Sequence, residues 1–95
     1  MSEDYIAWLR DNEADLFFNT SSSFKTDLMA VGWKCWEGYT QPFSEIWGEC
    51  QGKYYPEESL KRFACRVYKA RVLSKLKENP ILKELEVSWR ETCDR

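Results

Sequence analysis

Two carboxylates, Glu45 and Glu49, stand four residues apart, a spacing that places both on one face of a helix. Such pairs bind a metal ion or carry out acid-base chemistry when histidines accompany them, as in helical di-metal sites. The chain contains no histidine. We therefore expect no metal centre and no cofactor here, and place both carboxylates on the solvated face of their helix.

Sulfur chemistry is a second possibility, because the chain has four cysteines. They are Cys35, Cys50, Cys65 and Cys93. None is close enough to another to form a Cys-x-x-Cys zinc knuckle. Each stands beside apolar positions of a predicted helix, and nothing after Met1 resembles a secretory signal. We expect free core thiols in a reducing cytoplasm.

Other catalytic signatures are missing from the sequence. No glycine precedes a Lys-Ser or Lys-Thr pair of the kind that ends a phosphate-binding loop. Without histidine, no imidazole is available to activate a serine or cysteine nucleophile. We therefore expect a protein that is not an enzyme and that works by binding.

Composition predicts one globular domain covering residues 1–95, since the chain is too short to divide. Hydrophobic residues make up 43% and charged residues 32%, which argues against disorder. No apolar run approaches the ~20 residues that span a membrane. Aromatic residues reach 16% and include five tryptophans, more than a small core requires. Tryptophan also anchors interfaces, so the excess indicates a binding surface.

Helical periodicity predicts an all-α fold, a compact bundle of four to five helices around a long central helix over residues 56–77. The other predicted helices cover residues 3–18, 24–38, 42–50 and 80–92. Ser2 and Ser23 are the predicted N-caps of the first two. Pro42, Pro56 and Pro80 open the remaining three, because proline is well tolerated in the first helical turn.

The predicted central helix has an apolar side and a basic side. Its basic side consists of Arg62, Arg66, Lys69 and Lys77. This side is either a plain solvated face or a surface that attracts an acidic protein patch or the phosphates of a nucleic acid.

Charge is also divided along the chain. Residues 1–52 carry a net charge of −6 and residues 53–95 a net charge of +4. Either the two halves attract one another within the fold, or they meet partners of opposite sign. The acidic half argues against nucleic acid, because a duplex would repel it.

The helix predicted over residues 24–38 carries a second apolar line, opposite the line that faces the core. Met29, Trp33 and Trp36 form this second line at helical spacing. A helix that is apolar on two sides is central in its fold or buries one side in a partner. Because the helix over 56–77 takes the central place, we predict that these three residues bind a protein. Packing beneath a neighbouring helix is the alternative.

A short linker before the predicted central helix supplies a second candidate contact. Tyr54 and Tyr55 lie in it, and connecting segments run over the surface. A homodimer, in which Met29, Trp33 and Trp36 meet their own copies, is a further possibility, since two-fold dimers are the commonest assembly.

One sequence pattern resembles a known group of proteins. Tyr5 and Trp8 stand three residues apart, and after a polar spacer Trp33 and Trp36 repeat that spacing before Gly38. This pattern resembles small accessory proteins of tailed phages and prophages over residues 5–38. Cys35 and Glu37 depart from it, and the basic helix has no counterpart in it.

The resemblance implies a cytoplasmic protein of a bacterial host cell. Such a protein would bind a larger host protein and inhibit or modulate it stoichiometrically. CRISPR, restriction or recombination nucleases are the partners that the resemblance implies. The alternative is a nucleic-acid-binding accessory protein that uses the basic side of the helix over 56–77.

Overall fold

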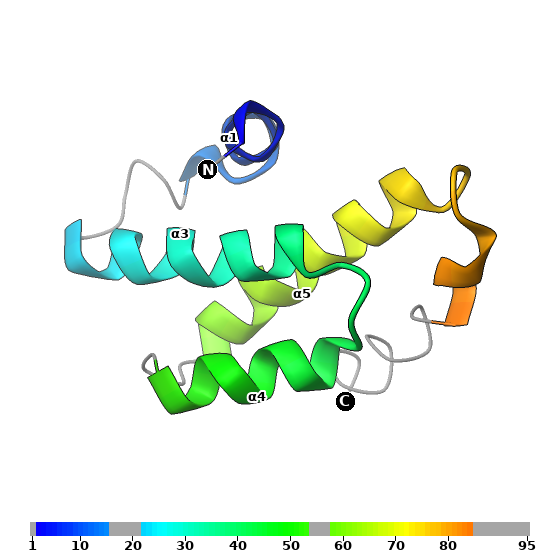
Figure 1. Cartoon of the computed structure of the whole chain (residues 1–95). Coiled ribbons are helices and arrows are strands. Elements are labelled where there is room, and N and C mark those ends of the chain that lie inside the picture. Colours follow the sequence, from blue (N-terminus) through cyan, green and yellow to red (C-terminus); the bar gives the residue numbers. More distant parts are fainter. Residues whose placement is uncertain (1, 16–21, 54–57, 85–95) are drawn as a thin grey trace.

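Helices make up the regular structure of the residues described by the computed structural model, which are 2–15, 22–53 and 58–84. The elements are α1 (Glu3–Asn12), α3 (Ser22–Glu37), α4 (Phe43–Lys53), α5 (Glu58–Lys75) and the short 3-10 helix η1 (Pro80–Leu82) (Figure 1). No strand occurs in those ranges. The predicted all-α class is therefore confirmed.

Helix α1 begins where its capping signal predicts and ends early. The Ser2 hydroxyl accepts the Tyr5 backbone N–H at 3.3 Å, and Glu3 and Asp4 lie in the first turn. The predicted continuous helix is interrupted at Glu13, which leaves the helical conformation while its N–H still donates to the Leu9 carbonyl at 2.8 Å. Residues 14 and 15 are helical again, and the predicted end near residue 18 lies outside the described residues.

The boundaries of α3 and α4 differ slightly from the prediction. Helix α3 begins at Ser22, so Ser23 lies inside the helix rather than at its cap. Helix α4 follows Pro42, whose carbonyl accepts the backbone N–H groups of Glu45 and Ile46. It continues to Lys53 instead of ending near Cys50.

The core lies chiefly between α3 and α5, which cross at Gly32. A Cβ atom placed on Gly32 would lie 2.8 Å from Phe63 Cε1 and 2.2 Å from Tyr5 Oη. Glycine is needed there because α1, α3 and α5 all approach at this position. The fully buried side chains of α3 and α5 include Leu28, Val31, Leu60, Phe63 and Val67.

Helix α1 lies across α3 on the side away from α4 (Figure 1). The fully buried Tyr5 donates its hydroxyl to the Met29 backbone carbonyl at 2.9 Å, in the space that Gly32 leaves open. Helix α3 is thus packed on by α1 as well as by α5. The expectation that α5 alone occupies the centre of the fold is not confirmed.

The connection between α3 and α4 is fastened to α5. The Tyr68 hydroxyl donates to the Gln41 backbone carbonyl at 2.6 Å, and the Tyr68 ring meets the Phe43 ring edge-on with centroids 5.4 Å apart. The Lys34 ammonium also pairs with the Glu49 carboxylate at 3.2 Å, joining α3 to α4.

The segment after α5 departs from the predicted helix over 80–92. Leu82 is buried as expected, but Ile81, expected on the buried side, is 72% exposed. Residues 83 and 84 continue helically after η1, and the remainder of that prediction lies outside the described residues.

Candidate functional site

The predicted protein-binding line on α3 lies largely beneath α1. The Trp33 and Trp36 ring centroids each lie 5.6 Å from the Tyr5 centroid. Trp36 is only 6% exposed, whereas Met29 and Trp33 are partly buried against the core. The expectation of an uncovered face is wrong for Trp36, because α1 supplies the aromatic rings that cover it.

The second predicted contact, Tyr54 and Tyr55, lies outside the described residues.

The basic side predicted along residues 56–77 is less continuous than its spacing indicates. Lys77 follows the end of α5 and lies in a turn. Arg62 and Lys69 are exposed on α5 itself.

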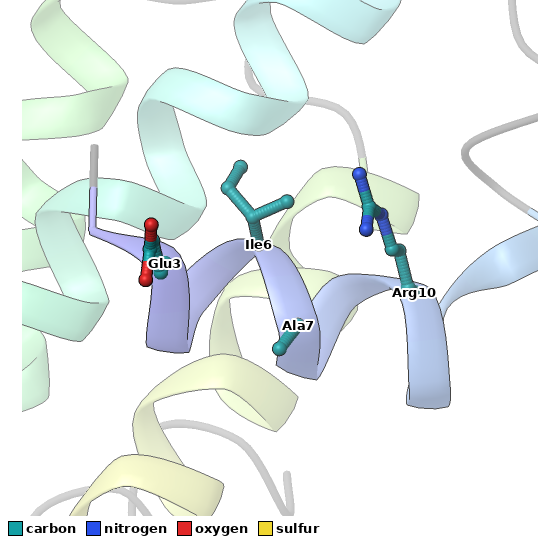
Figure 2. A pocket seen from close by; sticks show the side chains of 4 residues that line it. All are labelled: Glu3, Ile6, Ala7 and Arg10. Atoms are coloured by element: carbon teal, nitrogen blue, oxygen red, sulfur yellow. The ribbon is translucent and has the colours of Figure 1, made fainter.

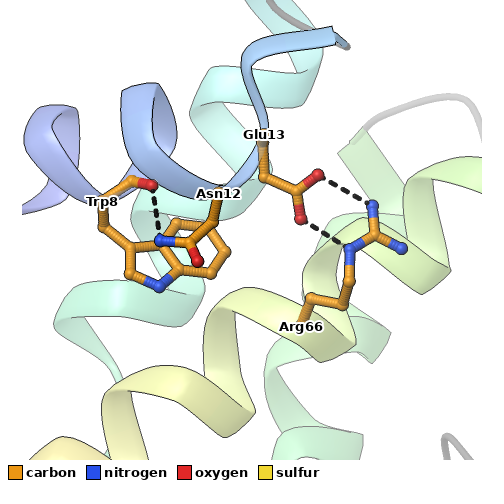
Figure 3. A network of polar contacts seen from close by, with 4 residues as sticks. All are labelled: Trp8, Asn12, Glu13 and Arg66. Atoms are coloured by element: carbon orange, nitrogen blue, oxygen red, sulfur yellow. Dashed lines mark hydrogen bonds and ion pairs between the residues drawn. The ribbon is translucent and has the colours of Figure 1, made fainter.

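Arg66 is paired within the fold. Its Nε donates to Glu13 Oε1, and its Nη2 donates to Oε2 at 3.3 Å, as Figure 3 shows. The Glu13 side chain is 9% exposed and that of Arg66 48%. This two-point contact joins the acidic half of the chain to the basic half, as one of the two interpretations of the charge pattern predicts. Glu13 therefore leaves α1 to neutralise a charge on α5.

Arg71 meets a different environment, one turn beyond Tyr68 on α5. Its guanidinium carbon lies 4.5 Å from the centroid of the Trp36 ring and 5.3 Å from that of Tyr39. Trp36 in turn lies 6.1 Å from the Trp8 centroid on α1. We call Trp8, Trp36, Tyr39 and Arg71 the aromatic-arginine cluster.

The Arg71 guanidinium has no hydrogen-bond acceptor among the residues that the structure describes. Its Nε is buried without a hydrogen-bond acceptor, and its other polar atoms form no ion pair with a described residue. The side chain as a whole is partly exposed, as are Trp8 and Tyr39. The cluster therefore presents a positive charge, held between aromatic rings, at the edge of the α1, α3 and α5 packing.

The sequence does not predict the cluster as a unit, although Trp8 and Trp36 belong to the pattern of tyrosine and tryptophan residues over residues 5–38. Tyr39 follows Trp36 by three residues, which places both rings near the end of α3. That spacing is a signal visible in the sequence. The position of Arg71 over both rings depends on how α5 crosses α3, which the sequence pattern does not specify.

The buried thiols and phenols are poorly placed for catalysis. Burial raises the pKa of Cys35, and the nearby Cys50 raises it further. Burial also raises the pKa of Cys50 and of Tyr5, and raises that of Tyr68 to about 12. A thiol held protonated at neutral pH is a weak nucleophile.

The cysteines do not all match the expectation of free thiols. Cys35 and Cys50 are free and buried. Cys65 is disulfide-bonded, which corrects that expectation at this position. Because disulfides are more typical of oxidising compartments, Cys65 gives no support to a reducing cytoplasm. Cys93 lies outside the described residues.

No other described feature forms a more convincing site. Within residues 2–15, 22–53 and 58–84, no three His, Cys, Asp or Glu side chains group as metal ligands. A hollow of about 410 Å³ is lined by Glu3, Ile6, Ala7 and Arg10, which lie along α1 alone (Figure 2). Its described lining comes from one helix and brings few polar groups together, unlike most ligand pockets.

Comparison of the chain with known protein families, curated proteins and solved structures finds no match. Among the helices in the described ranges, none combines the length and the apolar character needed to cross a bilayer.

Proposed function

We propose that this protein acts by binding a larger protein in a stoichiometric complex, not by catalysis, and that the aromatic-arginine cluster is central to the contact. The observation that carries this proposal is the position of Arg71, whose guanidinium lies over the rings of Trp36 and Tyr39 and forms no ion pair with a described residue. Tryptophan, tyrosine and arginine are the residues most enriched where interfaces concentrate their binding energy.

The burial of Trp36 changes which residues we expect to touch the partner. Trp36 supports the cluster from beneath, while Trp8, Tyr39 and Arg71 retain exposed surface. Met29 and Trp33 are partly exposed and extend the candidate surface along α3. Tyr54 and Tyr55 remain predicted contacts.

The proposed partner is a bacterial host protein, inhibited or modulated by a phage-encoded or prophage-encoded chain. CRISPR, restriction and recombination nucleases are the candidates. The support for this setting is the tyrosine and tryptophan spacing over residues 5–38, and a cytoplasmic location rests on the same resemblance.

A pull-down from bacterial lysate, followed by mass measurement of the cross-linked complex, tests the proposal. Wild type and Arg62→Glu are expected to capture the same protein in a fixed ratio, and Arg71→Glu is expected to lose it. Arg62 is the matched control because it is an exposed arginine on the same helix. Equal capture by Arg71→Glu would contradict the proposal.

The nucleic-acid alternative makes the opposite prediction. If phosphates bind the basic side of α5, nuclease treatment of the lysate removes the captured material and Arg62→Glu weakens binding. Affinity for duplex DNA would then fall steeply with rising salt. The pairing of Arg66 with Glu13 reduces the charge available to such a surface.

A homodimer would instead appear as a doubled mass for the pure protein in light scattering.

A further inference from the structure

The donors of Arg71 define what its partner must offer. A guanidinium presents five N–H donors in one plane and has no acceptor. In Arg71 the Nε donor is buried, which leaves the Nη donors to an incoming group, and the positive charge has no carboxylate beside it in the described part of the chain. The complementary group is therefore an anion with more than one acceptor oxygen.

The rings around Arg71 restrict how such a group can approach. Trp36 at 4.5 Å and Tyr39 at 5.3 Å from the guanidinium carbon occupy positions beside the guanidinium. An incoming anion must therefore meet the remaining edge. Arginine binds a carboxylate through two parallel N–H donors along that edge. Because the rings already hold the side chain in place, little side-chain entropy is lost on binding.

The surrounding charges favour a single carboxylate over a nucleic-acid backbone. A backbone binder needs several cations in a row, but Arg66 is already neutralised by Glu13. Glu37, which directly follows Trp36, is exposed at the end of α3. The whole chain carries a net charge of −2. One acidic side chain of a protein requires only one guanidinium and avoids most of this repulsion.

We infer that Arg71 receives the carboxylate of an aspartate or glutamate in the partner protein, with Trp36 and Tyr39 orienting the guanidinium. This inference rests on the proposed function and specifies the chemistry of the contact. It assigns the acidic partner surface, expected from the basic side of α5 as a whole, to one arginine.

Selection from a random peptide library displayed on phage tests the inference without knowledge of the partner. The purified wild-type chain is the bait, and each recovered peptide is synthesised and titrated against wild type, Arg71→Gln, Arg71→Lys and Arg62→Gln. We expect the peptides to share an Asp or Glu at a fixed position. Replacing that acid with its amide is expected to raise Kd about tenfold or more, since charged hydrogen bonds contribute on this scale.

The protein variants should follow the same pattern. Arg71→Gln is expected to raise Kd about tenfold for the acidic peptide and to leave Kd for the amide peptide nearly unchanged. Arg71→Lys should also bind more weakly, because an ammonium cannot present two parallel donors. Arg62→Gln should bind as wild type does. Circular dichroism melting of each variant shows that the loss does not come from unfolding.

The results separate this inference from the proposed function. Peptides that bind equally well to wild type and Arg71→Gln, or that share no acidic position, would overturn the carboxylate contact while leaving protein binding intact. Displacement of the peptide by duplex DNA, with equal loss in Arg62→Gln, would overturn it in favour of phosphate binding. A library without binders, together with a pull-down that captures nothing, would overturn both.

Discussion

Arg66 and Arg71 lie five residues apart on α5 and meet opposite surroundings. Arg66 donates to both carboxylate oxygens of the buried Glu13, so its positive charge is neutralised within the fold. Arg71 is placed beside two aromatic rings and its Nε has no acceptor. The Arg66 pair holds the end of α1 against α5. Arg71 keeps hydrogen-bond donors that can bind another molecule. The net charge of a helix face therefore does not indicate a binding surface until the contacts of each charged side chain are known.

The largest expected effect comes from removing the ring beneath Arg71. Trp36→Ala is expected to lower the free energy of unfolding by about 3–5 kcal/mol, because the side chain is buried among Tyr5, Trp8 and Arg71. Trp33→Ala, at a partly exposed ring, should cost less. Urea unfolding followed by far-UV circular dichroism measures both. Equal losses of stability in the two variants would contradict the deeper burial of Trp36.

The second test pushes α1 away from α3, and thereby also displaces Glu13, which follows α1. Gly32→Ala is expected to destabilise the fold by about 1–3 kcal/mol, since the added methyl group would lie 2.2 Å from Tyr5 Oη. Gly48→Ala is the matched control in α4, where an added Cβ meets nothing within 4 Å. It should be neutral or stabilise the fold by up to about 1 kcal/mol. Thermal melting measures both variants: Tm should fall for Gly32→Ala and should stay the same or rise for Gly48→Ala.

The third test measures the paired arginine directly. A double-mutant cycle with Glu13→Gln and Arg66→Gln should give a coupling energy of about 1 kcal/mol. This is modest because Arg66 is 48% exposed and solvent screens the pair. The same cycle between Glu13→Gln and Arg71→Gln should give a coupling near zero, because Arg71 does not bind Glu13. A substantial coupling in that second cycle would show that the two arginines are not independent.

The fourth test concerns the connection that carries Tyr39, and its effect is also small. Tyr68→Phe removes the hydroxyl that donates to the Gln41 carbonyl and should cost about 1 kcal/mol. Burial raises the pKa of Tyr68 from 10.0 to about 12, so the folded state holds this proton more tightly than the unfolded state. Its contribution is fully present below pH 10.0 and is lost as pH rises toward about 12.

Unfolding measured between neutral and alkaline pH tests this linkage. Tyr68→Phe should lose less stability than wild type over that alkaline range, although Tyr5 titrates in the same direction. Identical slopes for the two proteins would contradict the assignment to Tyr68.

The helical class and most helix starts follow from periodicity and capping, because those signals act between near neighbours in the chain. The pairing of Arg66 does not. Neither Arg66 nor Arg71 has an acidic residue three or four positions away, so local spacing cannot tell them apart. What separates them is the point at which α1 ends and turns Glu13 inward, a contact across 53 positions.

The aromatic line on α3 shows the same limit. Its spacing predicts a second apolar face, and packing beneath a neighbouring helix is one interpretation of that face. The other interpretation, a partner surface, requires α5 to take the only central place. Tyr5 and Trp8 on α1 supply large rings that cover Trp36, and helix periodicity alone does not say onto which neighbour those rings pack.

The way α1 is attached has a consequence for motion. Its described attachments to α3 and α5 are the tilted rings of Tyr5 and Trp8, the buried Leu9, one tyrosine hydroxyl and one ion pair. Most of the buried apolar side chains instead belong to α3, α4 and α5. A partial opening that releases α1 alone therefore costs less than global unfolding. In native-state hydrogen exchange, the amides of α1 should lose protection before those of α5, and the same opening would bring Met29, Trp33 and Trp36 to the surface together.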